Sequence, residues 1–306
     1  MNVAEQIVAQ LVDAGVHRIY GIVGDSLNPI VDAVRKTGGS KKGGIDWIHV
    51  RHEEAAAFAA SAEAQLPGKL AVCAGSCGPG NLHLINGLYD ANRTGAPVLA
   101  IASHIPSVQI GSTYFQETHP DRIFEECSVY NELISSAAQS PRTVNSAIRH
   151  AVGLGGVSVI TLPGDVSDLK AVEHVPTYAP ARPATLAPNP ADIDEAAALL
   201  NKADKVAIFA GAGVEGAHDE VIALADALKA PIGHSLRGKH FIQYDNPFDV
   251  GMTGLLGYGA AAEGMNDADV LVLLGTDFPH DQLLRDPPTI PVATHAEKVG
   301  RRTDVG

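Results

Sequence analysis

The chain has 306 residues, 45% hydrophobic and 19% charged, so it is long enough for two folded domains and too apolar to be disordered. Its formal net charge is −13, with 22 basic and 35 acidic residues and no basic run longer than two, which argues against a nucleic-acid-binding protein. The start MNVAEQ lacks the positive segment of a secretory signal, and no apolar run approaches the roughly 20 residues that span a bilayer. We therefore expect a cytoplasmic protein, and three sparse cysteines fit a reducing compartment.

The first half of the chain alternates helical and strand patterns. Apolar residues recur at helical spacing from Val3 to Val12, and a turn at Asp25–Pro29 leads into a second helix. Most expected strands are continuous apolar runs, which indicates a parallel sheet covered on both faces. The expected strands are His17–Val23, Trp47–Val50, Leu70–Ala74, Pro97–Ala102 and Val157–Leu162, with helices after Glu53, through Leu88 and over Thr143–Leu154.

A proline-rich segment separates this pattern from a second one. Residues 172–191 hold five prolines and no apolar periodicity, which is typical of a stiff linker. Helices over Ile193–Leu200 and Asp219–Leu228 then alternate with strands at Val206–Ala210, Pro231–Ser235 and Val270–Leu274. The sequence therefore predicts an α/β fold class with two Rossmann-like parallel-sheet domains, residues 1–171 and 192–306, joined by the linker 172–191.

Two carboxylates open an alanine-rich helix in the stretch VRHEEAAAFAASAEAQL, residues 50–66. Glu53 and Glu54 point about 100° apart, so only one of them can face a given site. Acids in a first helical turn complement the helix dipole, and the sequence by itself favours that structural role. Seven alanines nevertheless strip the helix of bulk and permit close packing, which can bury a carboxylate and suit it to proton transfer.

Three loop motifs follow predicted strands. GAGVEG, residues 211–216, matches the G-x-G-x-x-G pattern of dinucleotide sites, but the next strand ends at His234–Ser235 without an acid for a ribose, so nicotinamide is disfavoured. A plain strand-to-helix turn is about equally consistent with the motif. GSCGPG, residues 75–80, lacks the Lys-Ser/Thr pair of a phosphate loop, and GSTYFQETHP, residues 111–120, is typical of an ordered surface loop. Cys73 and Cys77 are expected to be small buried residues and not metal ligands.

Taken together, the segments resemble the thiamine-diphosphate enzymes that act on pyruvate, and within them the quinone-linked branch of the flavin-dependent pyruvate oxidases. The resemblance extends to about residue 284, and its narrower motifs are YFQETHP and YDNPFDVGMTG. It is carried by YGIVGDSLNPIVDA (20–33), VRHEEAAAFAASAEAQL (50–66), GPGNLHLINGLYDA (78–91), YFQETHP (114–120), GVSVITLPGDV (156–166), LRGKHFIQYDNPFDVGMTGLLGYGA (236–260) and VLVLLGTDFP (270–279).

The resemblance implies a role for individual residues. Residues 1–171 match the pyrimidine-binding domain, in which Glu53 matches the glutamate that hydrogen-bonds the cofactor's aminopyrimidine and thereby activates the thiazolium carbon. Glu54 has no such match and is expected to be structural. Phe115 and Gln116 match loop residues near the reacting end of the cofactor. Residues 192–306 match an incomplete FAD-binding middle domain, with expected flavin contacts at Gly211, Gly213, Thr253, Gly254, Leu255, Leu256, Gly275, Thr276, Asp277, Phe278 and Pro279.

Two departures from the family pattern bear on activity. The family holds the diphosphate and Mg²⁺ through a Gly-Asp-Gly motif in a third domain, and this sequence has none, so no metal ligand is assigned and the chain is expected to be inactive by itself. After Pro279 the family continues to a further strand. The stretch DPPTIPVATHAEKVGRRTDVG contains no β-branched run, so that strand is expected to be missing.

The activity implied by the resemblance is oxidative decarboxylation of pyruvate to acetate and CO₂, with electrons passing through FAD to a quinone. Its cofactors would be thiamine diphosphate, FAD and Mg²⁺. The alternatives are an acetolactate synthase, which condenses two pyruvates and is disfavoured by YDNPFDVGMTG, and a non-catalytic oligomerisation or regulatory module. Expected partners are pyruvate, a quinone acceptor and further copies of the chain in a dimer of dimers. Any peripheral contact with the inner face of the cell membrane belongs, in the resembling enzymes, to a C-terminal region that has no counterpart in this sequence.

Overall fold

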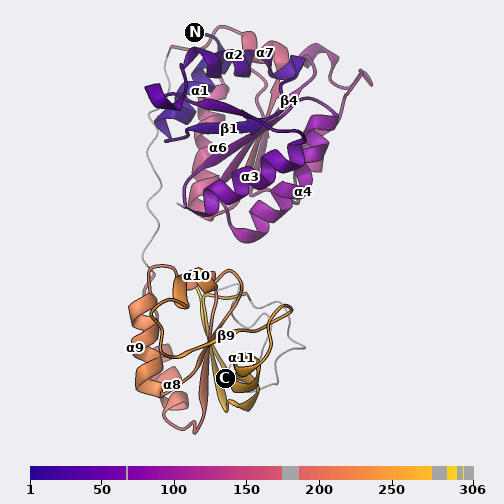
Figure 1. Cartoon of the computed structure of the whole chain (residues 1–306). Coiled ribbons are helices and arrows are strands. Elements are labelled where there is room, and N and C mark those ends of the chain that lie inside the picture. The colour runs from indigo at the N-terminus through magenta and orange to yellow at the C-terminus, as the bar shows by residue number, and fades with distance from the viewer. Residues whose placement is uncertain (67, 174–185, 278–287, 295–298, 300–306) are drawn as a thin grey trace. The chain divides into compact units, whose positions relative to one another are not determined.

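The computed structural model describes residues 1–66, 68–173, 186–277, 288–294 and 299. The chain forms two compact units, residues 1–183 and 184–306, each built on its own sheet (Figure 1). The division falls inside the predicted linker 172–191, of which residues 174–185 lie outside the described residues. The expected domain limits at residues 171 and 192 stay predictions.

The first unit is a six-stranded, wholly parallel sheet in the order β2-β1-β3-β4-β6-β5. Every residue of β4 and β6 is buried, as the continuous apolar runs predicted, whereas β5 at the edge is half exposed and was missed because its sequence YNEL is polar. The strands are β1 Arg18–Gly21, β2 Asp46–His49, β3 Ala71–Gly75, β4 Val98–His104, β5 Tyr130–Leu133 and β6 Val157–Pro163.

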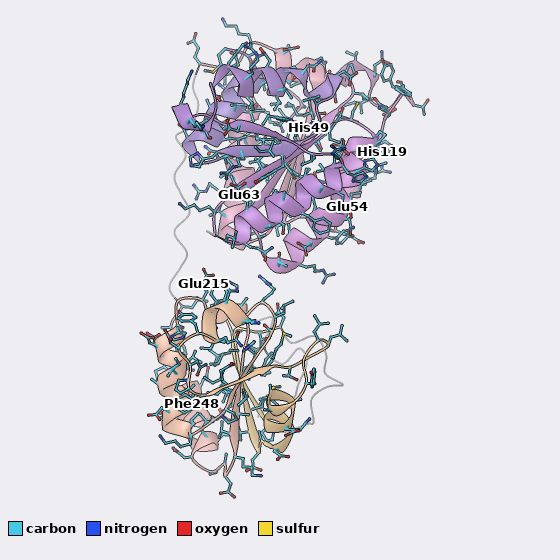
Figure 2. The ribbon with its side chains drawn as sticks, in the orientation of Figure 1. His49, Glu54, Glu63, His119, Glu215 and Phe248 are labelled. Carbon is cyan, nitrogen blue, oxygen red and sulfur yellow. The ribbon has the colours of Figure 1, made fainter. Side chains whose placement is uncertain are left out.

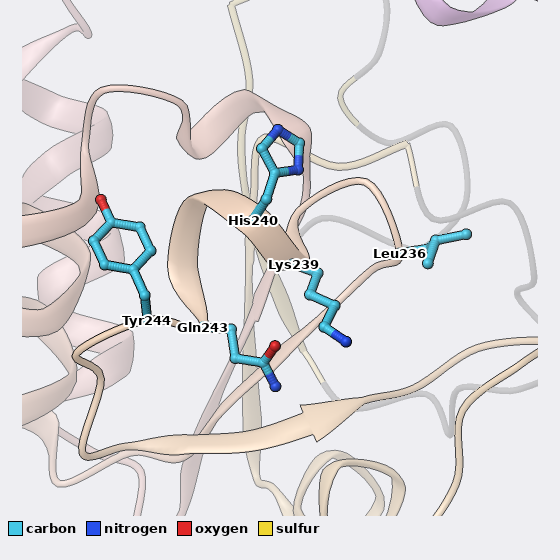
Figure 3. Close-up of a pocket in the computed structure, with 5 residues that line it drawn as sticks. All are labelled: Leu236, Lys239, His240, Gln243 and Tyr244. Atoms are coloured by element: carbon cyan, nitrogen blue, oxygen red, sulfur yellow. The ribbon is translucent and has the colours of Figure 1, made fainter. Parts of the chain in front are cut away.

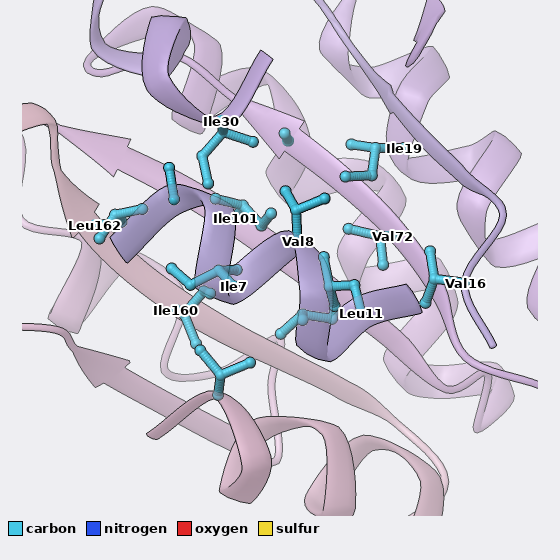
Figure 4. Close-up of a cluster of buried hydrophobic side chains, with 14 of the residues drawn as sticks. Ile7, Val8, Leu11, Val16, Ile19, Ile30, Val72, Ile101, Ile160 and Leu162 are labelled. Atoms are coloured by element: carbon cyan, nitrogen blue, oxygen red, sulfur yellow. The ribbon is translucent and has the colours of Figure 1, made fainter. Parts of the chain in front are cut away.

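Helices cover both faces of this sheet, each over its own apolar cluster. On one face, Ile7, Val8 and Leu11 of the first helix pack on aliphatic residues of the central strands, among them Val72 and Ile101 (Figure 4). On the other face, the alanines of α3 and the residues Leu84, Leu88 and Ala91 of α4 pack on β3, β4 and β6. The helices are α1 Val3–Asp13, α2 Asn28–Lys36, α3 Glu53–Gln65, α4 Pro79–Thr94, α5 Pro120–Ile123, α6 Ser140–Leu154 and α7 Gly164–Asp168.

The alanine-rich helix α3 lies unusually close to α4. A Cβ atom on Gly87 of α4 would stand 2.5 Å from the Cβ of Ala57 and 2.8 Å from the backbone nitrogen of Phe58. Real side chains do not tolerate such distances, so only glycine permits this approach. The expectation that the alanines allow close packing is confirmed.

The second unit is a five-stranded parallel sheet in the order β11-β10-β7-β8-β9. Two apolar clusters lie on this sheet, one of which includes Met265 of α11. Its strands are β7 Val206–Ala210, β8 Ile232–His234, β9 Asp249–Met252, β10 Val270–Leu274 and β11 Thr289–Val292, and its helices are α8 Pro190–Leu200, α9 His218–Leu228, α10 Lys239–Ile242 and α11 Ala260–Asp267. Two parallel α/β units confirm the predicted fold class.

One expectation about this unit is wrong. The strand after Pro279 was expected to be missing, but TIPV forms β11, which pairs with β10 in parallel register from Leu271–Thr289 to Leu274–Val292. The strand has four residues and lies at the sheet edge, where Pro291 is tolerated because one side of an edge strand needs no donor. The strand was not predicted because it is short and contains a proline.

In the described part of the chain, no helix combines the length and the hydrophobicity needed to cross a membrane.

Candidate functional site

The strand order of the first sheet reverses between β1 and β3. From β1 the chain adds β2 on one side, whereas β3, β4 and β6 extend on the other. Ligands of parallel α/β sheets bind outside the carboxyl ends of the strands at such a switch point. The loops after β1 and β3 meet there, since Ser26 Oγ lies 3.0 Å from Ser76 Oγ and 2.6 Å from Ser103 Oγ at the end of β4. The carboxyl ends of the strands at this switch point are the candidate site of the first unit.

Glu53 is a buried carboxylate at this edge. It occupies the first turn of α3, directly after the N-cap His52, and its side chain is only 9% exposed. Oε2 lies 2.9 Å from Nδ1 of His83 on α4. Oε1 lies 3.2 Å from the position that a Cβ atom on Gly80 would take. A carboxylate is rarely this buried without a full set of partners, so Glu53 is a candidate functional residue.

Glu54 has a different environment. Its side chain is 40% exposed, and Oε1 accepts a hydrogen bond of 2.6 Å from the Asn86 amide on α4. The carboxylates of Glu54 and Glu63 lie at opposite ends of α3 (Figure 2). The structure therefore buries the Glu53 side chain at the switch point and gives Glu54 a link between two helices, and the expected division of roles between them stays a prediction.

The loop that carries Phe115 and Gln116 reaches the same turn. Gln116 has a left-handed backbone, φ 63°, and packs on Gly78, where a Cβ atom would stand 2.8 Å from the Gln116 Cβ. Its Oε1 accepts a weak hydrogen bond from Cys77 Sγ at 3.5 Å. A non-glycine residue in this conformation is strained, a feature that concentrates at functional sites. Phe115 is 78% exposed. Both keep their predicted roles as expectations.

Two acidic residues that the sequence analysis missed hold this loop in shape. Glu117 accepts backbone hydrogen bonds from Gly111 and Tyr114, and the first of these bonds chiefly lowers the pKa of its carboxyl group. Asp165, from the LPGDV segment, accepts from the Ser107 backbone at 2.8 Å and from the Ser107 hydroxyl at 2.5 Å. These contacts join residues up to 58 positions apart, which no local pattern reveals.

His52, Glu53 and His83 form a cluster whose possible ligand atoms all lie within 4.8 Å of one another. The rings of the two histidines are stacked, with centroids 4.2 Å apart and planes inclined by 26°. A metal ion lies in the plane of each imidazole that binds it, and two stacked rings cannot share such an ion without turning. The arrangement therefore fits hydrogen bonding better than metal binding.

Cys73 and Cys77 are buried, as expected, and burial raises the pKa of the Cys73 thiol to about 12.

The second sheet has its switch point between β7 and β10, and the predicted flavin residues gather there. Gly211 and Gly213 follow β7, and Gly275 and Thr276 follow β10. The two turns pack backbone against backbone: a Cβ atom on Gly213 would stand 2.7 Å from the Gly275 Cα. The amides of Gly211 and Gly213 donate to Leu274 O at 2.8 Å and Gly275 O at 2.9 Å. These amides are thus used within the protein and cannot also cradle a phosphate.

The other predicted flavin residues extend from the neighbouring strand end. Thr253 follows β9, and its amide donates to His234 O of β8 at 3.3 Å. Leu255 and Leu256 are 76% and 69% exposed beside Gly254, whose φ is 116°. Asp277 belongs to the turn after β10, and Phe278 and Pro279 lie outside the described residues.

A surface cavity of about 410 Å³ lies elsewhere in this unit. It is lined by residues on and around α10, with the stem of Lys239 and the rings of His240 and Tyr244 around it (Figure 3). The cavity contains none of the predicted site residues, and each side chain that lines it is found on one short segment of the chain. We therefore assign the candidate sites to the two switch points.

Two sequence families match the chain. Residues 1–123 match the N-terminal TPP binding domain of thiamine pyrophosphate enzymes, and residues 193–306 match the central domain of the same enzymes. The chain belongs to the thiamine pyrophosphate enzyme family. The recognition of a thiamine-diphosphate enzyme, which is the same cofactor under its other name, is thus confirmed at the level of the family.

Relatives within the thiamine pyrophosphate enzymes carry different names. The chain is 54% identical over 304 residues to an uncharacterized 42.6 kDa protein of Pseudomonas amyloderamosa, covering 98% of this chain and 76% of that one. It is 34% identical to the pyruvate oxidase of Lactiplantibacillus plantarum (87% of this chain, 44% of that one) and 33% identical to a probable acetolactate synthase large subunit of Methanocaldococcus jannaschii (91% and 47%). The chain spans about half the length of these two enzymes, and their similar identities do not separate oxidase from synthase.

The described residues fit some parts of the cofactors of a thiamine enzyme and not others. One oxygen of the buried Glu53 carboxylate is paired and the other lies beside a glycine, which leaves it room to meet a ring nitrogen. In the second unit, the exposed Leu255 and Leu256 fit an apolar ring system such as a flavin, but the Gly211 and Gly213 amides do not fit a phosphate.

Proposed function

We propose that this chain supplies the pyrimidine-binding and flavin-binding parts of an enzyme that decarboxylates pyruvate oxidatively to acetate and CO₂. The observation that carries the proposal is the buried carboxylate of Glu53, held on one oxygen by His83 and open on the other beside Gly80. A buried carboxylate at a sheet switch point is the residue type that proton transfer to a bound ring requires.

The residues of the chain divide the work as follows. Bound thiamine diphosphate supplies the carbanion chemistry that cleaves the bond between the carboxylate and the carbonyl carbon of pyruvate. Glu53 Oε1 would hold the proton exchanged with the ring of the bound cofactor, and the burial of this side chain would keep water from competing for that proton. Gln116, fixed on the turn at Gly78, presents a polar amide at the same edge of the sheet.

The oxidative outcome rests on the second unit and on two sequence segments. FAD as electron carrier and a quinone as acceptor are proposed from YFQETHP and YDNPFDVGMTG, and the exposed Leu255 and Leu256 support an apolar ring beside them. Mg²⁺ is proposed only as the partner of the cofactor's diphosphate, through residues other than those described.

An acetolactate synthase is the second candidate, because synthases match the chain at 33% identity or slightly less, beside 34% for the oxidase. The two functions differ in their products. Acetate together with a reduced quinone or dye indicates the oxidase, and acetolactate without net electron transfer indicates the synthase. A homo-oligomer, expected as a dimer of dimers, is proposed from the exposed Phe58 and Leu82 on the outer side of the α3–α4 pair.

The test of the proposed function is Glu53→Gln in the full-length polypeptide, assayed with thiamine diphosphate, Mg²⁺ and an artificial electron acceptor. The amide keeps the shape of the side chain but cannot relay a proton, so we expect a loss of at least about 100-fold in kcat, the lower end for acid–base groups. Glu54→Gln is the matched control, one residue away and with only a helix link to lose. Full activity in Glu53→Gln with an inactive Glu54→Gln would refute the assignment.

A further inference from the structure

His83 is the one side chain in the described part of the chain that hydrogen-bonds the Glu53 carboxylate. It projects from the second turn of α4, three residues after Gly80, so both residues face α3. The Nδ1–Oε2 distance is 2.9 Å, and the ring is 43% exposed while the carboxylate is 9% exposed. The histidine thus closes the solvent side of a buried acid.

The ring of His83 is itself held in place by His52. Nδ1 of His52 accepts the Glu54 backbone amide at 3.2 Å, which fixes this residue as the N-cap of α3. The His52 ring then stacks on His83 at a centroid distance of 4.2 Å. A free histidine side chain turns about two bonds, and stacking against a capped neighbour removes much of that freedom.

We propose that His83 is the positioning residue of Glu53, donating from Nδ1 to Oε2 so that Oε1 alone is presented to the cofactor. The inference rests on the proposed function, in which Glu53 exchanges a proton with a bound ring. The structure gives Oε1 no hydrogen bond within the described residues, and Gly80 leaves space on its side. Without the donor, the carboxylate is free to rotate and to present either oxygen.

The proposal distinguishes two substitutions of similar size. His83→Asn keeps an N–H donor near the position of Nδ1, whereas His83→Leu fills the space without a donor. A hydrogen bond to a charged group contributes enough to predict a loss in kcat of roughly 10- to 100-fold for His83→Leu. We expect His83→Asn to retain most of the wild-type kcat, and we expect the KM for pyruvate to change little in both variants. His17→Asn, on an exposed loop, is the control.

The hydrogen bond itself is measured without turnover by nitrogen NMR of the imidazoles. When Nδ1 donates to a carboxylate, the neutral ring carries its proton on Nδ1, whereas a free histidine side chain favours Nε2. We therefore expect the Nδ1–H form for His83 in the wild type and a shift toward Nε2–H in Glu53→Ala.

The turnover assay and the nitrogen NMR measurement can each contradict a different part of the argument. Wild-type turnover of His83→Leu, or the Nε2–H form of His83 in the native protein, would overturn the positioning role. A wild-type protein that shows the Nδ1–H form but does not turn over pyruvate would instead refute the proposed function and establish the His83–Glu53 hydrogen bond alone.

Discussion

His104 and His218 respond to protons in opposite senses. His104 ends β4 and is 3% exposed, and its Nδ1 has no hydrogen-bond partner in the described residues. Burial therefore lowers its pKa, against a smaller opposing effect of Glu117. His218 begins α9 and hydrogen-bonds the Asp219 carboxylate at 3.0 Å and the Tyr244 carbonyl at 2.9 Å, which together raise its pKa. The two units thus carry histidines with opposite pH dependence.

Acidification should destabilise the first unit through His104. The pKa of His104 is lower in the folded unit than in the unfolded chain. From about pH 6.5 downward, the unfolded chain therefore binds a proton at His104 that the folded unit does not bind. The free energy of unfolding falls as the pH drops from about 7 toward the lowered pKa. Trp47 is the single tryptophan and lies in the first unit, so its fluorescence in urea titrations reports that unit. We expect His104→Gln to reduce the pH dependence of the free energy of unfolding, and the control His17→Asn to leave that dependence unchanged.

The second unit should behave in the opposite way. His218 contributes stability that is fully present below pH about 6.5 and is lost as the pH rises through its raised pKa. Amide hydrogen exchange in β7 measures this contribution, and His218→Gln should remove the difference between acidic and neutral pH. Stability of the β7 amides that rises with pH in the wild type would contradict the sign.

At the scale of elements, the contact of α3 with α4 brings Glu53 and His83 together. The helices approach so closely because alanines line one of them and Gly87 lies in the other. This spacing is the reason that a carboxylate on the first turn of α3 meets an imidazole on the second turn of α4. A wider gap would leave Glu53 exposed and unpaired.

Substituting Gly87 tests this packing. Glycine-to-alanine changes inside helices usually stabilise by about 0.5–1 kcal/mol, but at position 87 the new methyl group would meet backbone and a Cβ atom at 2.5–2.8 Å. We expect Gly87→Ala to destabilise the first unit by roughly 1–3 kcal/mol, as overpacking does. Gly153→Ala, on the exposed side of α6, should stabilise it instead. Urea unfolding followed by Trp47 fluorescence gives both values, and equal stabilisation by the two would refute the close contact.

The sequence predicted the central strands and the edge strand β2, and it missed the edge strands β5, β9 and β11. Strands such as Val157–Leu162 are continuous apolar runs because both faces of a central strand are covered, so composition alone reveals them. The edge strands β5 and β11 are short and polar or proline-bearing, since an edge imposes fewer demands. The motif GAGVEG was equally consistent with a cofactor loop and with a plain turn. The packing of Gly211 and Gly213 on Gly275 is a long-range contact that spacing cannot show, and the flavin role stays a prediction.

Of the candidate site, the sequence analysis named residues expected to carry chemistry, and it did not name the residues that the structure shows holding them in place. Glu53 and Gln116 were identified by resemblance to a family. His83 and Asp165 were missed because their partners, Glu53 and Ser107, lie on another helix or 58 positions away. Glu117 was missed although its partners Gly111 and Tyr114 are in its own loop, because an irregular loop has no periodic pattern. Helix and strand periods describe one element at a time, whereas these contacts arise only when elements pack.

At the scale of the whole molecule, both sheets place their candidate residues at a switch point. In the proposed function, the candidate residues of the first unit are Glu53, with Gln116 and Phe115 on a loop, and they would meet only the aminopyrimidine end of the cofactor. The diphosphate end needs Mg²⁺ with oxygen ligands in octahedral arrangement, and the sequence contains no Gly-Asp-Gly motif to provide them. A formal charge of −13 further disfavours an anionic cofactor tail.

We therefore expect the 306-residue chain by itself to bind thiamine diphosphate no more tightly than thiamine, which lacks the diphosphate, and to be indifferent to Mg²⁺. Both ligands share the aminopyrimidine, so equal and weak affinities, with Kd well above the micromolar range, follow if only that end finds partners. Calorimetric titrations of the chain with each ligand, with and without Mg²⁺, measure this, and Glu53→Gln should weaken both alike. Micromolar, Mg²⁺-dependent binding of the diphosphate form, or pyruvate turnover by the chain alone, would show that these residues also hold the charged end of the cofactor.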